Sequence, residues 1–95
     1  MIKEMIRVGG GFIEAILIEL GDHNLIILRG SKGYIMCGYL DMDVAINFGD
    51  VAIKITEVNT IQEALYTTAK EVSKGAEKIG IHEGQNISDI LELIV

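Results

Sequence analysis

Glycine-rich turns divide the first 40 residues into short apolar segments, and this spacing constrains the fold more than any other feature. The glycines lie at positions 9–11, 21, 30 and 33, and between them run residues 2–8, 12–20, 25–28 and 34–39. Glycine is typical of tight turns because it adopts positive φ at little steric cost. Strands this closely spaced pair most simply with their neighbours. We therefore expect an antiparallel meander.

The pattern changes after residue 40. Asp41 or Asp43 is predicted to cap a short helix over residues 44–48, which Gly49 ends. Residues 51–58 (VAIKITEV) alternate between apolar and polar side chains, which indicates a fifth strand.

The rest of the chain reads as helix. Thr60 to Glu63 matches the capping-box pattern of a helix start, and Thr68 to Glu71 matches it again. We expect a break near Tyr66–Thr67, then a helix over residues 69–79 ended by Gly80, and a last helix after Asn86. The prediction is one α+β domain over residues 1–95, with an antiparallel sheet of about five strands and two to four short helices packed on one face.

The chain is too apolar for a sheet with one solvated face. Hydrophobic residues make up 49% of it, and segments 12–20, 25–28 and 34–39 carry aliphatic side chains on both faces. Helices from the second half can cover one face, which leaves the other as a larger patch than monomers usually expose. We expect a homodimer or higher homo-oligomer that buries it. In the alternative, a connection such as residues 80–86 folds over the patch.

Charge and composition exclude several partners. The net charge of −6 argues against nucleic acid, which requires clustered basic residues. No apolar run approaches the roughly 20 residues that span a bilayer, and the alternating start MIKEMIRV is no signal peptide, so no membrane partner is expected. The single cysteine fits a cytoplasmic location.

Cys37 is the first candidate for chemistry. If residues 30–33 form a four-residue loop, Ile26 lies opposite Cys37 and Leu28 lies opposite Ile35. Cys37 then lies among aliphatic side chains as an inert packing residue. The alternative is a reactive thiol close to Asp41, activated by a positive neighbour or by the start of the helix that follows.

Carboxylates and histidines give weaker signals. Asp41 and Asp43 have a spacing that can ligate Mg²⁺ or Ca²⁺, but at a strand-to-helix junction a capping role is the simpler interpretation. His23 in a turn and His82 after a helix lack partners at zinc-ligand spacing.

Gly38 lies inside a predicted apolar strand, which indicates a bulge or a close approach to the backbone. A neighbouring helix or subunit is the favoured approaching group and a ligand is the alternative. Gly38 and Tyr39 are therefore the candidate ligand-binding residues.

Four segments carry a resemblance to a known family. They are GYIMCGYLD, GDVAIKITEV, TIQEAL and KIGIHEG, and together they resemble the YunC-type domain-of-unknown-function family over roughly residues 11–93. The most specific segment is the octet Tyr34 to Asp41. The resemblance implies a small α+β fold without an established activity, and it carries over no catalytic residue. Residues 51–58 are more aliphatic than the family pattern, and no proline stands near Thr67.

These observations favour a non-enzymatic binding or assembly module. A small enzyme with a thiol-dependent site, formed by Cys37 with Asp41 or Asp43, is the alternative, so catalysis stays an open question. The sequence assigns no cofactor, and the identity of a small-molecule ligand is unknown.

Overall fold

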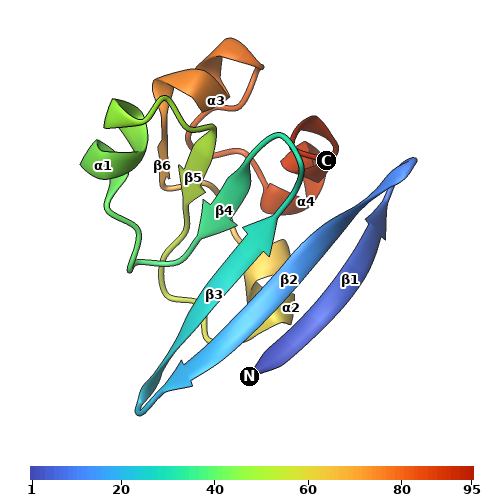
Figure 1. Cartoon of the computed structure of the whole chain (residues 1–95), viewed down its shortest axis with the longest axis vertical. Coiled ribbons are helices and arrows are strands. Elements are labelled where there is room, and N and C mark those ends of the chain that lie inside the picture. Colours follow the sequence, from blue (N-terminus) through green and yellow to red (C-terminus); the bar gives the residue numbers. More distant parts are fainter.

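The computed structural model describes all residues from Met1 to Val95 and confirms the α+β class. A six-stranded sheet has the order β1 to β6, with helices packed against it (Figure 1). The strands are β1 (Ile2–Val8), β2 (Gly11–Leu20), β3 (His23–Arg29), β4 (Tyr34–Met36), β5 (Ala52–Lys54) and β6 (Glu71–Val72). The helices are α1 (Met42–Asn47), α2 (Ile61–Leu65), α3 (Lys74–Lys78) and α4 (Ile87–Ile90), followed by a 3-10 turn over Leu91–Leu93.

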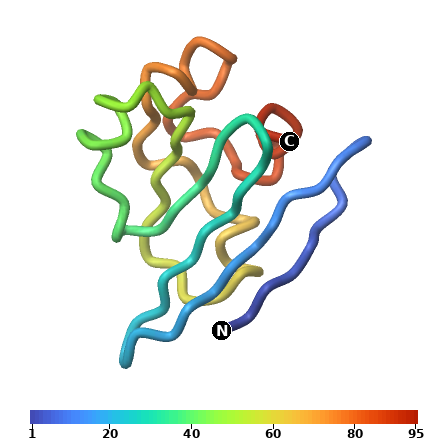
Figure 2. The backbone as a smooth tube through the Cα atoms, in the orientation of Figure 1, coloured from blue at the N-terminus to red at the C-terminus, as the bar shows by residue number.

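Strands β1 to β4 form the predicted antiparallel meander, which Figure 2 shows as long, twisted hairpins. Leu28 lies opposite Ile35, as the loop length predicted. The turn before β3 is shorter than expected, because Gly21 has a φ of 77° and permits a tight connection with Asp22. His23 therefore begins β3 and does not lie in a turn.

The sheet is mixed, where the sequence predicted only antiparallel pairing. β4 and β5 run parallel, and the connection between them contains α1. A parallel pair needs such a crossover, because the chain must return to the same edge of the sheet before the second strand starts. β5 also spans only three residues of the predicted segment 51–58.

The predicted helix over residues 69–79 is wrong in its first half. Glu71 and Val72 form β6, an edge strand antiparallel to β5. The backbone N–H groups of Lys70 and Ser73 donate to β5 carbonyls at 2.8 and 2.9 Å. Pairing with β5 therefore replaces helical bonds there, and the helix begins only after Ser73, whose hydroxyl caps it.

Two other helix starts agree with the sequence. Asp41, one of the two predicted caps, accepts hydrogen bonds from the N–H groups of Asp43 and Val44 at the start of α1. Thr60 accepts from the N–H of Glu63 at 3.0 Å at the start of α2. Both ends use a side-chain oxygen to satisfy N–H groups that the helix leaves free.

Helices lie on both faces of the sheet, and not on one face as predicted. The inner face carries the main core, which α2, α3 and α4 cover through buried residues such as Ala64, Ala76 and Ile90. On the outer face, α1 covers β4 and β5, where Leu40, Ala45 and Ala52 form a second small core. The outer face of β1 to β3 has no helix over it. No helix is long and apolar enough to cross a membrane.

Candidate functional site

A pocket of about 380 Å³ lies at the edge of the sheet where the parallel strands end. Residues 37–39, which follow β4, form one wall, and Glu57 and Val58, which follow β5, form another. His23 and Asn24 at the start of β3 complete it, because β3 runs antiparallel to β4. In open sheets with parallel strands, the crevice beyond the carboxyl ends is a common ligand site.

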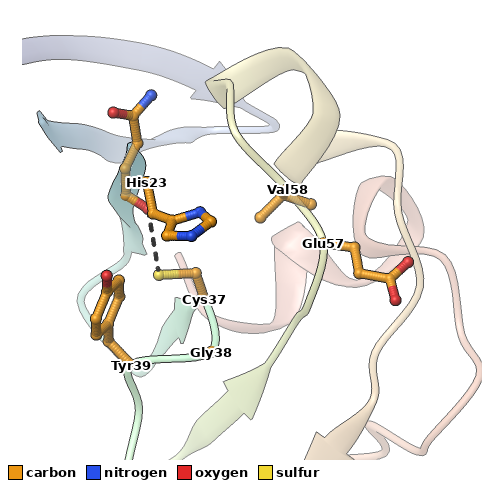
Figure 3. A pocket seen from close by; sticks show the side chains of 7 residues that line it. His23, Cys37, Gly38, Tyr39, Glu57 and Val58 are labelled. Atoms are coloured by element: carbon orange, nitrogen blue, oxygen red, sulfur yellow. Dashed lines mark hydrogen bonds between the residues drawn. The ribbon is translucent and has the colours of Figure 1, made fainter. Parts of the chain in front are cut away.

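Cys37 contributes its sulfur to this pocket from the core side. Its side chain is only 4% exposed and belongs to the main core cluster. The backbone N–H of Ile26 donates to the sulfur at 3.3 Å, and the thiol donates weakly to the Asn24 carbonyl at 3.9 Å (Figure 3). The predicted packing role is therefore correct in part, since the same sulfur also lines the pocket.

The nearest polar side chains differ from those the sequence indicated. The imidazole of His23 and the ring of Tyr39 lie on either side of the Cys37 sulfur, whereas the carboxylate of Glu57 points away (Figure 3). A thiol and an imidazole at one opening can support nucleophilic chemistry in which the imidazole accepts the thiol proton. From the sequence, His23 is expected in a turn without a ligand partner, whereas the structure places its ring beside Cys37.

Gly38 is a turn residue, and the predicted strand 34–39 ends two residues before it at Met36. The N–H of Leu40 donates to the Cys37 carbonyl at 3.0 Å, which closes a turn around Gly38. Apart from the two neighbouring residues, no atom lies within 4 Å of the position that a Cβ at residue 38 would take, so no helix of this chain packs there. Its φ is also outside the left-handed region, so the backbone does not require glycine.

Glu57 is the one non-glycine residue with positive φ, at 60°. A residue with a Cβ pays a steric cost of about 1 kcal/mol in this conformation. Asn24 braces the same segment, because its side-chain amide donates to the Asn59 carbonyl at 2.8 Å. The wall of the pocket after β5 is thus held in an unfavourable backbone conformation, as is common at functional sites.

Asp41 and Asp43 do not line this pocket. They lie in a second, polar hollow of about 390 Å³, with Lys54 and Glu71 on its far side and Tyr39 shared with the first pocket. Asp41 is engaged as the cap of α1, and Lys54 lies 3.5 Å from Glu71. No three or more His, Cys, Asp or Glu side chains come close enough to hold a metal ion. The structure therefore separates Cys37 from both aspartates.

Three comparisons place the chain among known proteins. The family model of a domain of unknown function, DUF1805, matches residues 36–94. The crystal structure of a protein of unknown function from Thermoplasma acidophilum superposes with a TM-score of 0.94 at 32% sequence identity, covering 98% of this chain and 91% of that one. No curated protein matches the chain.

The matched segment begins at the last residue of β4 and runs past α4, and it therefore contains both walls of the pocket that follow the parallel strands. The chain belongs to the DUF1805 family of domains of unknown function.

Proposed function

We propose that this chain is a small-molecule binding module whose ligand enters the pocket beyond β4 and β5 and contacts the Cys37 sulfur. The proposal extends to membership of the YunC-type family, because the octet Tyr34 to Asp41 supplies three of the residues that line the pocket. It also extends to a cytoplasmic location, because a free thiol suits a reducing compartment.

The observation that carries the proposal is the open space beside Gly38 in the pocket wall. A glycine is usually explained by positive φ or by a neighbouring group that a side chain would meet. Gly38 shows neither, since its φ is not left-handed and nothing of this chain approaches its Cβ position. Because Gly38 lines the pocket, the absence of a side chain there leaves room beside the thiol, which supports a ligand at this position.

The lining suits a small molecule of mixed character. Cys37 and Val58 supply apolar surface at the inner end, and the His23 imidazole, the Asn24 backbone and the Tyr39 hydroxyl supply polar groups around the opening. Small-ligand sites combine apolar walls with a few positioned polar groups in this way.

The test uses iodoacetamide as a probe of access to the pocket. Alkylation of the native chain transfers the acetamide group to the Cys37 sulfur, with loss of the thiol proton and of iodide. We expect native labelling within about tenfold of the unfolded rate, and we expect Gly38→Val to slow it more than tenfold by filling the space beside the thiol. Gly10→Val is the matched control, because Gly10 is also open but lies in a distant turn.

The thermal midpoint of Gly38→Val should stay within a few degrees of the wild type, since, apart from the two neighbouring residues, no atom lies within 4 Å of the Cβ position. Equal native labelling of wild type and Gly38→Val, or protection of Cys37 by many orders of magnitude in both, would contradict the proposal.

A second function is favoured by the position of His23. If the imidazole accepts the thiol proton, the pocket is the site of a small thiol-dependent enzyme, with Cys37 as nucleophile and His23 as general base. In this version the ligand is an electrophilic substrate that forms a covalent bond with the sulfur and later leaves it.

The two functions differ in their dependence on His23. An enzyme requires His23→Ala to slow iodoacetamide labelling of Cys37 at neutral pH, whereas His82→Ala, which removes the other histidine, should have no effect. A plain binding pocket predicts no slowing by either substitution. An increase in the labelling rate with His23→Ala would show that the ring only screens the sulfur, which excludes the enzyme and leaves the binding module.

A further inference from the structure

The chain leaves the two parallel strands in opposite directions. The last hydrogen bond between them joins the N–H of Ile55 to the Met36 carbonyl at 2.9 Å. Beyond it, the segment after β4 passes to the outer face of the sheet, where α1 packs against β5. The segment after β5 passes to the inner face, where Ile61 and Ala64 of α2 join the main core. Connections that part in this way open a crevice at the carboxyl ends of the strands, and open α/β sheets bind their ligands in such a crevice.

The pocket already described is one half of this crevice, and the second hollow is the other. In the second hollow, Asp41 and Asp43 follow β4, and Lys54 is the last residue of β5. Lys54 lies on the outer face because it is two residues after Ala52, which packs under α1. Tyr39 lines both cavities. We name the first pocket the thiol half and the second hollow the carboxylate half.

The carboxylate half carries an excess of negative charge. Its charged side chains are three carboxylates and one ammonium, a net charge of −2, and they belong to Asp41, Asp43, Glu71 and Lys54. The ammonium of Lys54 lies 3.5 Å from Glu71, which leaves the charges of the two aspartates uncompensated. One oxygen of Asp41 accepts both N–H bonds of the helix cap, so its second oxygen stays available to a ligand. A cavity lined by one sign of charge concentrates ligands of the opposite sign.

We propose that the ligand is a small organic cation that lies across Tyr39, with its uncharged end beside the Cys37 sulfur and its ammonium group in the carboxylate half. This inference rests on the proposed binding function and adds the chemical class of the ligand. Tyr39 is then the specificity-determining residue, because its half-exposed ring lies beside the sulfur and borders both halves (Figure 3). The face of an aromatic ring attracts a cation.

The lining suits an organic cation better than a metal ion. No three or more His, Cys, Asp or Glu side chains come close enough to coordinate a metal, whereas an ammonium group needs no complete coordination shell. Leu40 and Met42 in the carboxylate half and Val58 in the thiol half provide apolar surface for a carbon chain. The two halves, of about 380 and 390 Å³, together fall within the roughly 300–1,000 Å³ of small-molecule sites.

The experiment compares three methanethiosulfonates of different charge, namely the neutral methyl, the cationic 2-aminoethyl and the anionic 2-sulfonatoethyl reagents. Each forms a disulfide with the Cys37 sulfur, while the S–S bond of the reagent breaks, methanesulfinate leaves and the thiol proton passes to solvent. Dividing each native rate by the rate for the unfolded chain corrects for intrinsic reactivity and for the net charge of −6. We expect the corrected rate of the cationic reagent to exceed that of the anionic reagent at least about tenfold, and added salt to reduce this preference.

Variants locate the source of the preference. Asp43→Asn and Glu71→Gln should each reduce it about threefold, as for a surface charge pair, and leave the rate of the neutral reagent unchanged. Glu92→Gln is the matched control, because Glu92 lies beside Gly11 at the start of β2, at the other end of that strand from the thiol half. Tyr39→Leu should also reduce the preference, whereas Tyr39→Phe should retain it because phenylalanine keeps the ring.

The outcomes separate the ligand class from the binding function. Rapid labelling by all three reagents without preference for the cation would overturn the cationic ligand and keep the binding pocket. A preference that both Asp43→Asn and Glu71→Gln leave intact, or a preference for the anionic reagent, would have the same meaning. Protection of Cys37 from the neutral reagent by many orders of magnitude would overturn both the ligand class and the binding function.

Discussion

Ile26 and Cys37 hold each other through two hydrogen bonds. The N–H of Cys37 donates to the Ile26 carbonyl at 3.1 Å, and the N–H of Ile26 donates to the Cys37 sulfur at 3.3 Å. The first bond continues the β3–β4 ladder by one residue beyond the strand pairing. The second gives the sulfur a fixed position at the inner end of the pocket.

Cys37→Ala should destabilise the fold modestly. The substitution leaves the buried N–H of Ile26 without a partner, and we expect the free energy of unfolding to fall by about 1–2 kcal/mol. Cys37→Ser should lower the free energy of unfolding by less, because the serine hydroxyl can still accept a hydrogen bond from the N–H of Ile26. Urea unfolding measures both. Stability unchanged by Cys37→Ala would show that the sulfur makes no useful contact with Ile26.

Ser73→Ala should be the more damaging of two cap substitutions. The Ser73 hydroxyl is fully buried, accepts from the N–H groups of Ala52 and Ala76, and donates to the Asp50 carbonyl at 2.7 Å. Loss of these bonds should cost about 2–4 kcal/mol. Thr60→Ala, at the exposed cap of α2, should cost only about 1 kcal/mol. Chemical denaturation that ranks Thr60→Ala as the costlier change would contradict this reading.

Tyr34 should ionise only at unusually high pH. Burial, with help from the hydrogen bond to Asp50, raises the pKa of Tyr34 from 10.0 to about 12. As pH rises, the unfolded chain loses this proton first. The stability that the neutral hydroxyl contributes is therefore complete below about pH 10 and is lost as the pH approaches 12. Phenolate absorbance should show a step near pH 12 that Tyr34→Phe abolishes, and the absence of this step from the wild type would refute the prediction.

Glu14 should stabilise the fold only above mildly acidic pH. The hydrogen bond from Lys3, opposed by desolvation and supported by Arg29, holds the pKa of Glu14 below its ordinary value of 4.5. The contribution is present above that value and is lost as the pH falls through the folded pKa. Glu14→Gln should lower the thermal midpoint at neutral pH and match the wild type in strong acid, whereas Glu19→Gln on the same strand should have little effect. If the thermal midpoint of Glu14→Gln stayed below that of the wild type in strong acid, the substitution would have removed packing contacts and not ion pairs.

Local features of the fold were predictable because neighbouring residues determine them. Glycine spacing defines the meander, and the length of the loop over residues 30–33 sets the register that puts Leu28 opposite Ile35. The caps Asp41 and Thr60 are recognisable because each lies within three residues of the N–H groups it satisfies.

The direction of β5 depends on contacts that no local pattern contains. A strand at residues 52–54 can pair with β4 in either direction, and parallel pairing follows from the packing of Ala45 on Ala52 on the outer face. Residues 69–73 lie in a predicted helical stripe, yet the N–H groups of Lys70 and Ser73 donate to carbonyls of β5. Contacts between segments that are distant in the sequence decide both cases, through packing in the first and hydrogen bonding in the second.

The sequence predicts the residues of the site that follow β4, but not those that β3 and the segment after β5 contribute. Cys37, Gly38 and Tyr39 attract attention as an unusual run after an apolar strand, and all three line the pocket. His23 comes from a turn whose length differs from the predicted one by two residues, which changes where its ring lies. Glu57 is identifiable only by its φ of 60°, a property of the folded backbone.

The parallel pairing of β4 with β5 has a consequence for the order of folding. Hairpins between consecutive strands close short loops and form in about 1–10 μs, whereas the β4–β5 pair must wait for α1 to collapse onto a sheet that already exists. The pocket is therefore completed after the meander, because its wall of Glu57 and Val58 follows β5, the strand that docks later. Pulse-labelled hydrogen exchange should protect the amides of β2 before those of β5, so that an intermediate with an intact meander has not yet acquired a place for a ligand.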